Sequence, residues 1–573
     1  MDEGNIVNRK LSKGAMVGLI TMALSWLIAN KAYPWLPAWN EGLAFAATLI
    51  LWIAAAVQTK KIQPPAPGIA WPLLVFVFLA LVVVWGQHFA GLLIFSGDAF
   101  LISLYLSTFL IALHAGSLIE KSNEREEWII AFIATIATSA ILSIGIALIQ
   151  WTKTWDLAVF LMETDIGDRP GANLGQINNF STLCFIAFCG ILYLRNQGQL
   201  HLSSTILAGG VLTFGMAITQ SRTGWLQIVS IFLLTIFSSG NKKQKITTGL
   251  LSVTFAVWYM AIPWLQSTAL LTADQQTRAL PLHDVRLTMW SALLDASSIR
   301  PWFGYGWLQT GWAQQVTAET HPILRTYMSY SHNLALDLIV WNGWPIAIIL
   351  LGLLFVWFFQ NLSHRKRDDG NNYLYCAVLG VFIHGMLEYP LTYAYFLMPL
   401  GLIMGYLDGT QSNLVKCHFK WKQIVIFMFT TCILYFAICV DYINAVPLDV
   451  AVRLRSAQIG PRPAYNEQPT KFLVLNQLAT MYAMRTMQED EYAIEKNITL
   501  MAKVVQRYPY SPALFQYALA NAMHGDRLVA ETQLKVLCGI YTAAHCITIE
   551  KRWQIFQQKY PESVGLIIFP KIQ

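Results

Sequence analysis

The chain has 573 residues, of which 55% are hydrophobic and only 12% are charged. Soluble domains carry about 25% charged residues, so this composition excludes an ordinary water-soluble protein and indicates that lipid covers most of the surface. The net charge of +7 is explained by membrane topology, and no nucleic-acid partner is expected.

The hydropathy pattern predicts an all-α, polytopic membrane protein. An apolar helix of about 20 residues crosses a bilayer, and about thirteen such segments begin near residues 14, 42, 69, 100, 128, 176, 202, 223, 246, 334, 371, 396 and 423. The first follows a basic stretch that ends at Lys13 and lacks a small-residue cleavage site. We therefore expect it to stay as an anchor, with no signal peptide removed.

The basic residues predict the orientation of the spans. Alternate loops are rich in Lys and Arg, as at Lys121 and Arg125, 242–245 and 416–422. Short cytoplasmic loops collect such residues, so the N-terminus is expected in the cytoplasm. An odd number of crossings, about thirteen, then leaves the C-terminus on the opposite side.

Two long non-cytoplasmic regions divide the chain into four parts. We expect an N-terminal membrane region with polar outer loops, a large outer loop, a second membrane region and a small helical domain, over residues 1–265, 266–333, 334–440 and 441–573.

The large outer loop contains a pattern typical of an amphipathic helix at the membrane surface. Asp284 is the expected N-cap and Pro301 ends the pattern. Its apolar face consists of Leu287, Trp290, Leu293 and Leu294.

The C-terminal region reads as several amphipathic helices. Its stretch ALFQYALANAMHGDRLVAETQLKVL has the small-residue and Gly-turn pattern of a tetratricopeptide unit, but an ordinary small helical domain also fits, because one or two units are fewer than a stable solenoid needs. Cys538 and Cys546 lie eight residues apart here. They can form a disulfide in an oxidising compartment and would stay reduced in the cytosol.

Two short polar segments lie between apolar spans on the outer side. In residues 168–182, the amides of Asn173, Gln176, Asn178 and Asn179 either line a polar cavity or cap a helix in a hydrated loop, because unsatisfied polar groups are costly in lipid. In residues 328–338, a span begins directly after His332 and Asn333, and carries Asp337. A histidine can accept the proton of an alcohol, although an interfacial histidine can also be structurally ordinary. An ionisable group inside a span, such as Asp337, is a functional candidate, but so near the helix end it can also simply reach the interface.

Arginines and a further polar segment complete the candidates. Arg222 and Arg286 lie on the outer side and can neutralise a pyrophosphate by bidentate hydrogen bonding. No outward Asp-X-Asp motif that would hold a divalent cation is found, so neither a metal nor another cofactor is expected. In residues 384–396, His384 and Glu388 are spaced to share a helix face, and Tyr389, Tyr393 and Tyr395 either form an interfacial belt or stack on sugar rings.

Together these residues resemble the O-antigen ligase and polymerase superfamily, membrane glycosyltransferases that use undecaprenyl-pyrophosphate-linked glycans. The resemblance rests on His332, Asn333, nine further residues and Gly343, on the preceding RLTMWSALLDASSIRPWFGYGW, and on Arg222. Ile346 departs from the Gly, Thr or Tyr usual in lipopolysaccharide ligases. RPGANLGQINNFSTL and HGMLEYPLTYAYF resemble the protein-glycosylating branch, the O-linked protein glycosylation ligases or O-oligosaccharyltransferases, as does the soluble C-terminal domain.

The resemblance implies a GT-C-like enzyme of the bacterial inner membrane with a periplasmic C-terminus. Its partners would be an undecaprenyl-pyrophosphate-linked oligosaccharide, membrane lipid and an exported, pilin-like acceptor protein whose Ser or Thr hydroxyls receive the glycan. The implied roles are catalysis for His332, Gln176 and Asn333, pyrophosphate binding for Arg222 and Arg286, and substrate binding for Tyr389, Tyr393, Glu388, Asn178 and Asp337.

Three other functions fit parts of the pattern. The acceptor can be lipid A core sugar, as in an O-antigen ligase, or the growing glycan, as in a polymerase. A transporter would instead use the polar segments as a path, but the sequence shows no obvious inverted repeat and its polar groups gather on one face.

Overall fold

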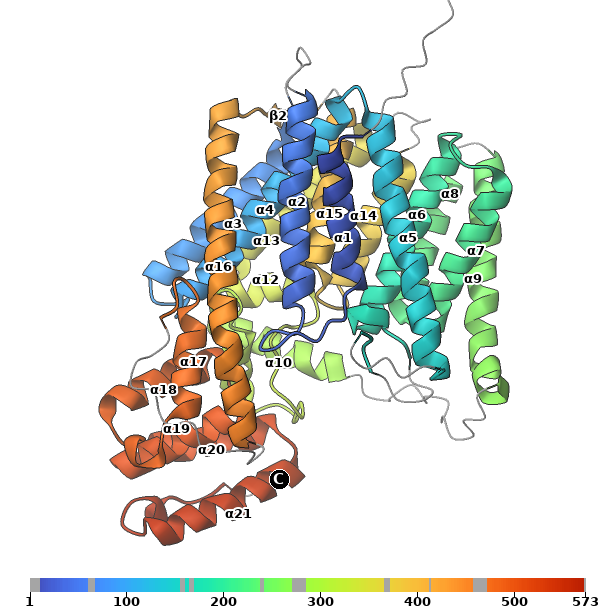
Figure 1. The fold of residues 1–573 in the computed structure, drawn as a ribbon. Coiled ribbons are helices and arrows are strands. Elements are labelled where there is room, and N and C mark those ends of the chain that lie inside the picture. Colours follow the sequence, from blue (N-terminus) through green and yellow to red (C-terminus); the bar gives the residue numbers. More distant parts are fainter. Residues whose placement is uncertain are drawn as a thin grey trace, which may run out of the picture. The chain divides into compact units, whose positions relative to one another are not determined.

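A computed structural model describes residues 11–59, 67–154, 160–163, 169–237, 242–269, 285–364, 371–411, 414–456 and 471–570 (Figure 1). Most of this part of the chain is helical. Its two short strands, β1 (Ile69–Ala70) and β2 (Lys416–Cys417), pair antiparallel with Ile69 opposite Cys417. The all-α fold is thereby confirmed.

The helices match the expected membrane spans. Each of the thirteen expected segments has a helix that begins within a few residues of its expected start. Eight described helices are long and apolar enough to cross a bilayer, and four shorter apolar helices accompany them. The chain is therefore a multi-pass membrane protein. One span differs from expectation, because the segment from residue 334 is broken at Gly343 into α12 (Leu334–Asn342) and α13 (Trp344–His364).

The chain forms two compact units, which are described separately. Unit 1 comprises Met1–Val77, Tyr105–Ala279 and Leu353–Cys432, and unit 2 comprises Phe78–Leu104, Leu280–Gly352 and Ile433–Gln573. Besides α13, three helices run from one unit into the other along the chain: α3 (Trp71–Phe89), α4 (Ser96–Lys121) and α16 (Trp421–Ser456). The four-part division expected from the sequence stays a prediction.

Unit 1 is built around one buried helix. Its helices are α1 (Lys13–Leu27), α2 (Ala38–Thr59), α5 (Arg125–Thr152), α6 (Ile177–Asn196), α7 (Leu202–Ile218), α8 (Arg222–Phe237), α9 (Lys242–Ala269), α14 (Asn372–Gly385) and α15 (Ala394–Thr410). Helix α6 is buried throughout from Asn179 to Leu194, and α5, α7, α8 and α14 pack against it (Figure 1). Small residues permit the close approach, since the missing side chain of Gly380 in α14 leaves room for the ring of Phe185 in α6.

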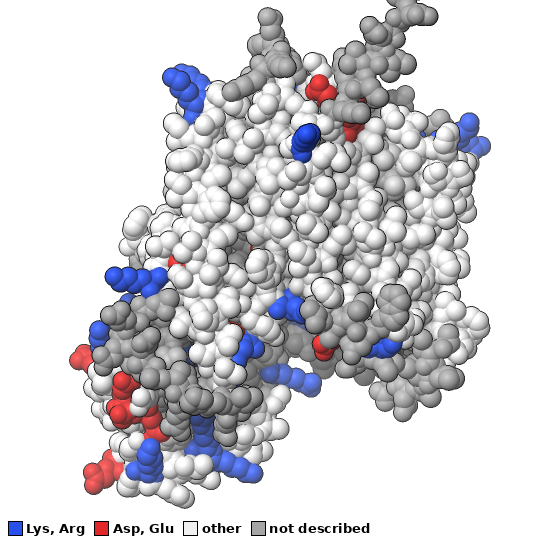
Figure 2. Space-filling view, viewed as in Figure 1, with Lys and Arg blue, Asp and Glu red and all other residues white. Residues whose placement is uncertain are grey.

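The surface of these helices is suited to lipid. Figure 2 shows few described Lys, Arg, Asp or Glu side chains in the middle of the face over α1, α2 and α5, and more toward the helix ends. Large apolar side chains are exposed instead, among them Val82 of α3, Val257 and Met260 of α9, and Phe436 of α16. A water-soluble monomer rarely exposes so much apolar surface.

Unit 2 joins the outer loop to the C-terminal helices. The outer loop supplies α10 (Val285–Ile299) and α11 (Thr310–Thr317), and α12 follows directly after it. The C-terminal part supplies α17 (Asn476–Thr486), α18 (Glu495–Arg507), α19 (Ser511–His524), α20 (Arg527–Ile540) and α21 (Ala543–Lys559). Consecutive helices from α17 to α21 pack on one another around an apolar core that includes Phe515, Leu519 and Trp553.

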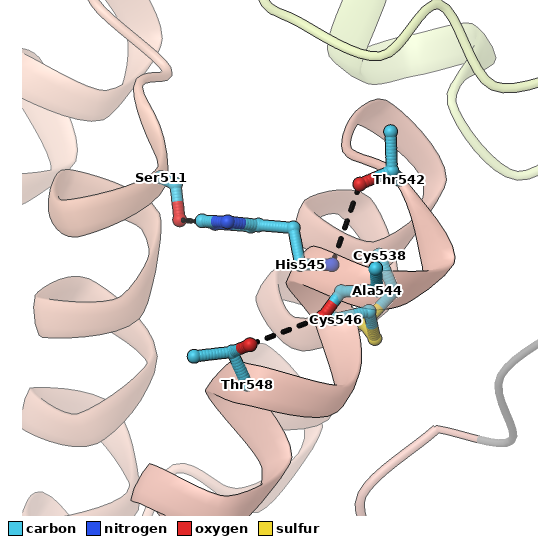
Figure 3. Close-up of a disulfide and its surroundings, with 7 residues drawn as sticks. All are labelled: Ser511, Cys538, Thr542, Ala544, His545, Cys546 and Thr548. Atoms are coloured by element: carbon cyan, nitrogen blue, oxygen red, sulfur yellow. Dashed lines mark hydrogen bonds between the residues drawn. A yellow bond between two sulfur atoms is a disulfide. The ribbon is translucent and has the colours of Figure 1, made fainter.

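The disulfide expected as one of two alternatives is present in unit 2. Cys538 near the end of α20 and Cys546 in the first turn of α21 are bonded, with their Cα atoms 5.3 Å apart (Figure 3). The ring of His545 points away from the disulfide toward Ser511 at the start of α19, and its Nε2 lies 2.7 Å from the Ser511 hydroxyl. The disulfide and this hydrogen bond fix α21 against the neighbouring helices.

Helix α10 exists, but its buried face differs from expectation. It ends at Ile299, before Pro301, as predicted, while Asp284 lies outside the described residues. Met289, Leu293 and Ala296 are buried, whereas Leu287 and Leu294 are 64% and 41% exposed. The expected face was wrong in part, because tertiary packing against α11 and α12 selects the neighbouring stripe.

Candidate functional site

The candidate residues lie in both units. Unit 1 carries Gln176, Asn178, Arg222, Glu388, Tyr389 and Tyr393, and unit 2 carries Arg286, His332, Asn333 and Asp337. Each cluster is built by its own unit and is described separately.

Helix α6 begins with an amide cap. The Gln176 side-chain oxygen accepts the backbone N–H of Asn179 at 3.0 Å, satisfying one of the amides that a helix start leaves unpaired. Asn173 is buried and holds the preceding loop, because its amide donates to the carbonyl oxygens of Leu27 and Phe160 at 2.7 and 3.0 Å. Support of the loop therefore accounts for Asn173, and Gln176, which caps α6, has a side chain that is only half-buried.

Asn178 connects three segments of unit 1. Its Nδ2 donates to the Glu388 carboxylate at 3.1 Å, and its Oδ1 accepts the Ser221 hydroxyl at 2.6 Å. Ser221 is buried and directly precedes Arg222, the exposed first residue of α8. The network thus fixes the α7–α8 turn that carries Arg222. Sequence reasoning missed Ser221, whose only signal was its place beside Arg222.

In the polar segment 384–396, His384 and Glu388 do not share a helix face as expected. Helix α14 ends at Gly385, so Glu388 lies beyond it, and the Glu388 N–H donates to the His384 carbonyl at 2.9 Å. The buried His384 instead places its Nδ1 2.9 Å from the Thr182 hydroxyl of α6. The expectation failed because a helix pattern in sequence does not reveal where the last turn unwinds.

The tyrosines of this segment form a row of rings. Tyr393 stacks on Tyr395 with centroids 5.0 Å apart, and Tyr389 lies 5.8 Å from Tyr393. Tyr395 is fully buried and accepts the Asn179 amide at 3.2 Å, whereas Tyr389 and Tyr393 are half-buried. Burial, with the Glu388 carboxylate adding to it, raises the pKa of Tyr389, so its hydroxyl stays protonated at neutral pH. Of the three rings in this row, only those of Tyr389 and Tyr393 are not fully buried.

In unit 2 a tight turn presents His332. The histidine has a positive φ of 57°, a conformation that is uncommon outside glycine. The preceding Ser331 is held from two sides, since its N–H donates to the Asp337 carboxylate at 2.7 Å and its carbonyl accepts the Trp290 indole of α10 at 2.8 Å. Asn333 is the N-cap of α12 and accepts the Leu336 N–H at 3.1 Å. Asp337 and Asn333 thus shape the backbone around a half-buried imidazole.

The far end of α12 shows why Gly343 belongs to the motif. Its φ is 77°, and a Cβ there would lie 2.5 Å from the Trp302 carbonyl carbon. Pro301 accepts the Trp344 N–H at 2.8 Å, and the Tyr305 N–H donates to Val340 at 2.8 Å. The segment after α10 therefore packs backbone to backbone against the α12–α13 break, which only glycine permits.

Arg286 lies on the side of α10 that faces this turn. It is half-buried and four residues before Trp290, the residue that bonds Ser331, so the two share a helix face. A guanidinium on that face can bind a phosphate while the imidazole accepts a proton.

Comparison with known proteins finds matches along most of the chain. The family model described as "O-Antigen ligase" matches residues 207–351, and the model "Virulence factor membrane-bound polymerase, C-terminal" matches residues 373–559. A "General O-oligosaccharyltransferase" from Acinetobacter baylyi is 30% identical over 407 residues, 68% of this chain and 69% of the relative. The chain belongs to the O-oligosaccharyltransferase family of the O-antigen ligase superfamily.

A second relative of this O-oligosaccharyltransferase aligns over more of its length. A "ComP-specific O-oligosaccharyltransferase" of the same organism is 26% identical over 536 residues, 90% of this chain and 93% of the relative. The ligase match includes Arg222, Arg286 and His332, and the polymerase match includes the tyrosine row. The enzyme is therefore a membrane glycosyltransferase that transfers an oligosaccharide to protein.

Proposed function

We propose that this enzyme transfers a glycan en bloc from undecaprenyl pyrophosphate to Ser or Thr hydroxyls of an exported protein such as a pilin. The reaction takes place at the periplasmic face of the bacterial inner membrane, with the N-terminus cytoplasmic and the C-terminus periplasmic. The observation that carries the proposal is the braced turn at Ser331, which presents His332 beside the face of α10 that bears Arg286.

The chemistry is a single displacement. The acceptor hydroxyl oxygen bonds to the anomeric carbon of the glycan, the bond from that carbon to the phosphate oxygen breaks, and the hydroxyl proton moves to the His332 imidazole. Arg222 and Arg286 stabilise the negative charge on the departing undecaprenyl pyrophosphate. The configuration at the anomeric carbon inverts.

The remaining candidate residues bind or orient. Tyr389 and Tyr393 stack on sugar rings, and Glu388 and Asn178 hold the turn of Arg222 and line the glycan site. Gln176 contacts the substrate beside them, while Asn333 and Asp337 orient His332 through the backbone. No metal takes part, so transfer should continue in EDTA.

The deciding experiment is transfer by purified enzyme of a labelled undecaprenyl-pyrophosphate glycan to a pilin-like protein. Wild type should label a hydroxyl residue, and His332→Ala should not. His321→Ala is the matched control, because His321 belongs to the same unit but pairs with Asp295 at the surface, at 2.9 Å; it should retain activity.

The two family descriptions name the alternatives. An O-antigen ligase would label lipid A core sugar, and a polymerase would extend the glycan. Label on either acceptor and none on protein would overturn the proposed acceptor, and solute flux without glycan transfer would instead indicate a transporter.

A further inference from the structure

Helix α11 of the outer loop is docked on the C-terminal helices. The Gln315 side chain donates to the Val505 carbonyl of α18 at 3.0 Å. Just beyond α11, Ala318 is part of the apolar core of the C-terminal helices, and a Cβ at Gly539 of α20 would collide with the Ala318 carbonyl. The outer loop and the C-terminal helices therefore share one core.

Helix α11 in turn holds the chain that leads to His332. Gln314 is only 4% exposed, and its side chain pairs with the backbone on both sides of Tyr327. Its Nε2 donates to the Thr326 carbonyl at 3.0 Å, and its Oε1 accepts the Met328 N–H at 2.8 Å. Arg325 also forms a parallel β-bridge with Tyr541, directly after α20.

The same segment is fixed at its other end by Ser331. Only residues 329 and 330 separate Met328, held by α11, from Ser331, held by α10 and α12. A buried ion pair anchors α18 itself, because the Arg507 guanidinium donates to both carboxylate oxygens of Asp98 at 2.8 and 3.2 Å. The C-terminal helices, α11 and the His332 turn are thus connected by an unbroken series of contacts.

We infer that the C-terminal helices position the catalytic turn through α11, with Gln314 as the positioning residue. This inference rests on the proposed role of His332 and gives the C-terminal domain a part in catalysis distinct from acceptor recognition. Misplacement of a catalytic group by about 1 Å can lower a rate by roughly a hundredfold, so a small shift of α11 should be visible in turnover.

Three variants test the inference. Gln314→Leu removes both hydrogen bonds, Gln314→Glu keeps the acceptor for Met328 but loses the donor to Thr326, and Gly539→Ala pushes α20 away from Ala318. Gly565→Ala is the matched control, because its Cβ would have no neighbour closer than 3.6 Å. Thermal unfolding in detergent verifies that each variant folds.

We expect Gln314→Leu and Gly539→Ala to lower kcat by roughly ten- to a hundredfold for a folded acceptor and a short peptide alike, with KM unchanged. The kcat of Gln314→Glu should lie between the kcat of these two variants and that of wild type, and the kcat of Gly565→Ala should equal that of wild type. A rise in KM for the folded acceptor only, with normal transfer to the peptide, would show that the domain recognises the acceptor and would overturn the inference.

Hydrogen exchange separates failure of the inference from failure of the proposed function. Residues 326–331 should exchange faster in Gln314→Leu and Gly539→Ala than in wild type and Gly565→Ala, whatever reaction the enzyme performs. Unchanged exchange in residues 326–331 would refute the positioning role even if His332 proved essential. Faster exchange in the variants of an enzyme that transfers nothing to protein would support the positioning role and reject only the proposed reaction.

Discussion

At the scale of single residues, the candidate side chains are held mainly through backbone and amide contacts. Asn178 uses both ends of its amide, one on Glu388 and one on Ser221, and Asp337 acts on the N–H of Ser331. A hydrogen bond between neutral groups contributes about 0.5–1.5 kcal/mol, and one to a charged acceptor about 1.5–3 kcal/mol. The free energy that organises the site therefore resides partly in residues that need not touch the substrate.

The Asn178–Glu388 contact gives a graded prediction. Glu388→Gln keeps an oxygen that can accept from Asn178, so transfer should fall by no more than about threefold. Glu388→Leu removes the acceptor and leaves the Asn178 amide without this partner, which should slow transfer by roughly ten- to a hundredfold, the rate equivalent of about 1.5–3 kcal/mol. Initial rates at saturating donor measure both, and equal losses would show that the charge of Glu388, not its bond to Asn178, is what matters.

At the scale of elements, the sequence predicted the existence of the helices better than their ends. Apolar runs located the spans because burial or lipid exposure requires them. The break at Gly343 and the end of α14 at Gly385 depend on contacts with distant segments, such as the Trp302 backbone, that no local pattern reveals. The residues that brace the site, Ser221, Ser331 and Gln314, escaped notice for the same reason, since their partners are remote or are backbone atoms.

Helix packing in unit 1 predicts a sensitive glycine. Gly405 of α15 lies directly against the Leu113 backbone of α4, and Gly116 of α4 lies against the Leu402 carbonyl of α15. Gly405→Ala must separate two backbones, so the melting temperature in detergent should fall by several degrees, as for a loss of about 1–3 kcal/mol by overpacking.

The same substitution elsewhere is the control for Gly405. A Cβ at Gly145 of α5 would meet no atom within 4 Å, so Gly145→Ala should unfold at the wild-type temperature or slightly above, because alanine favours a helix. If both variants melted alike, close approach of α4 and α15 would not be what Gly405 provides.

A second element-scale prediction concerns the attachment of the C-terminal helices to α16. The Asp441 carboxylate accepts the N–H groups of Leu473, Val474 and Leu475 at 2.6, 2.7 and 2.7 Å. Asp441→Leu removes the acceptor of three backbone N–H groups, of which that of Leu475 is buried, so limited proteolysis should cut near residues 471–475 faster than in wild type. Asp526→Leu, which changes an exposed aspartate at the α19–α20 turn, should leave the cleavage rate unchanged, and equal cleavage of all three proteins would contradict the prediction.

At the scale of the whole molecule, the sequence predicted the all-α membrane fold and the glycosyltransferase family. It did not predict which segments of the chain fold together into each compact unit. Residues 78–104, 280–352 and 433–573 form one unit, although long membrane segments separate them along the chain. From sequence, the outer loop and the C-terminal region were treated as separate regions, because an amphipathic pattern shows that a helix face is buried but not which segment covers it. Only the shared core around Ala318 and Leu519 reveals that the two regions fold together.

The Cys538–Cys546 disulfide connects this organisation to the orientation of the protein in the membrane. A disulfide persists in the periplasm and is reduced in the cytosol. In the proposed orientation, with a cytoplasmic N-terminus and an odd number of crossings, α20 and α21 would lie in the periplasm, and native enzyme is then expected to hold both sulfurs oxidised. Maleimide-polyethylene glycol, which labels free thiols, should then add two more labels to denatured wild type after reduction than before it. The Cys538→Ser/Cys546→Ser double variant should take up the same number of labels before and after reduction.

The same pair predicts a local loss of stability. In the chain-entropy model, closing so short a loop raises the free energy of the unfolded chain by roughly 2.5 kcal/mol. Reduction should therefore lower the unfolding midpoint of the C-terminal helices, and reductant should not change the midpoint of the double variant. Because the disulfide lies at the junction of α20 and α21, hydrogen exchange should rise first around residues 538–546. Equal labelling of wild type before and after reduction would place this domain in a reducing compartment and reverse the proposed orientation.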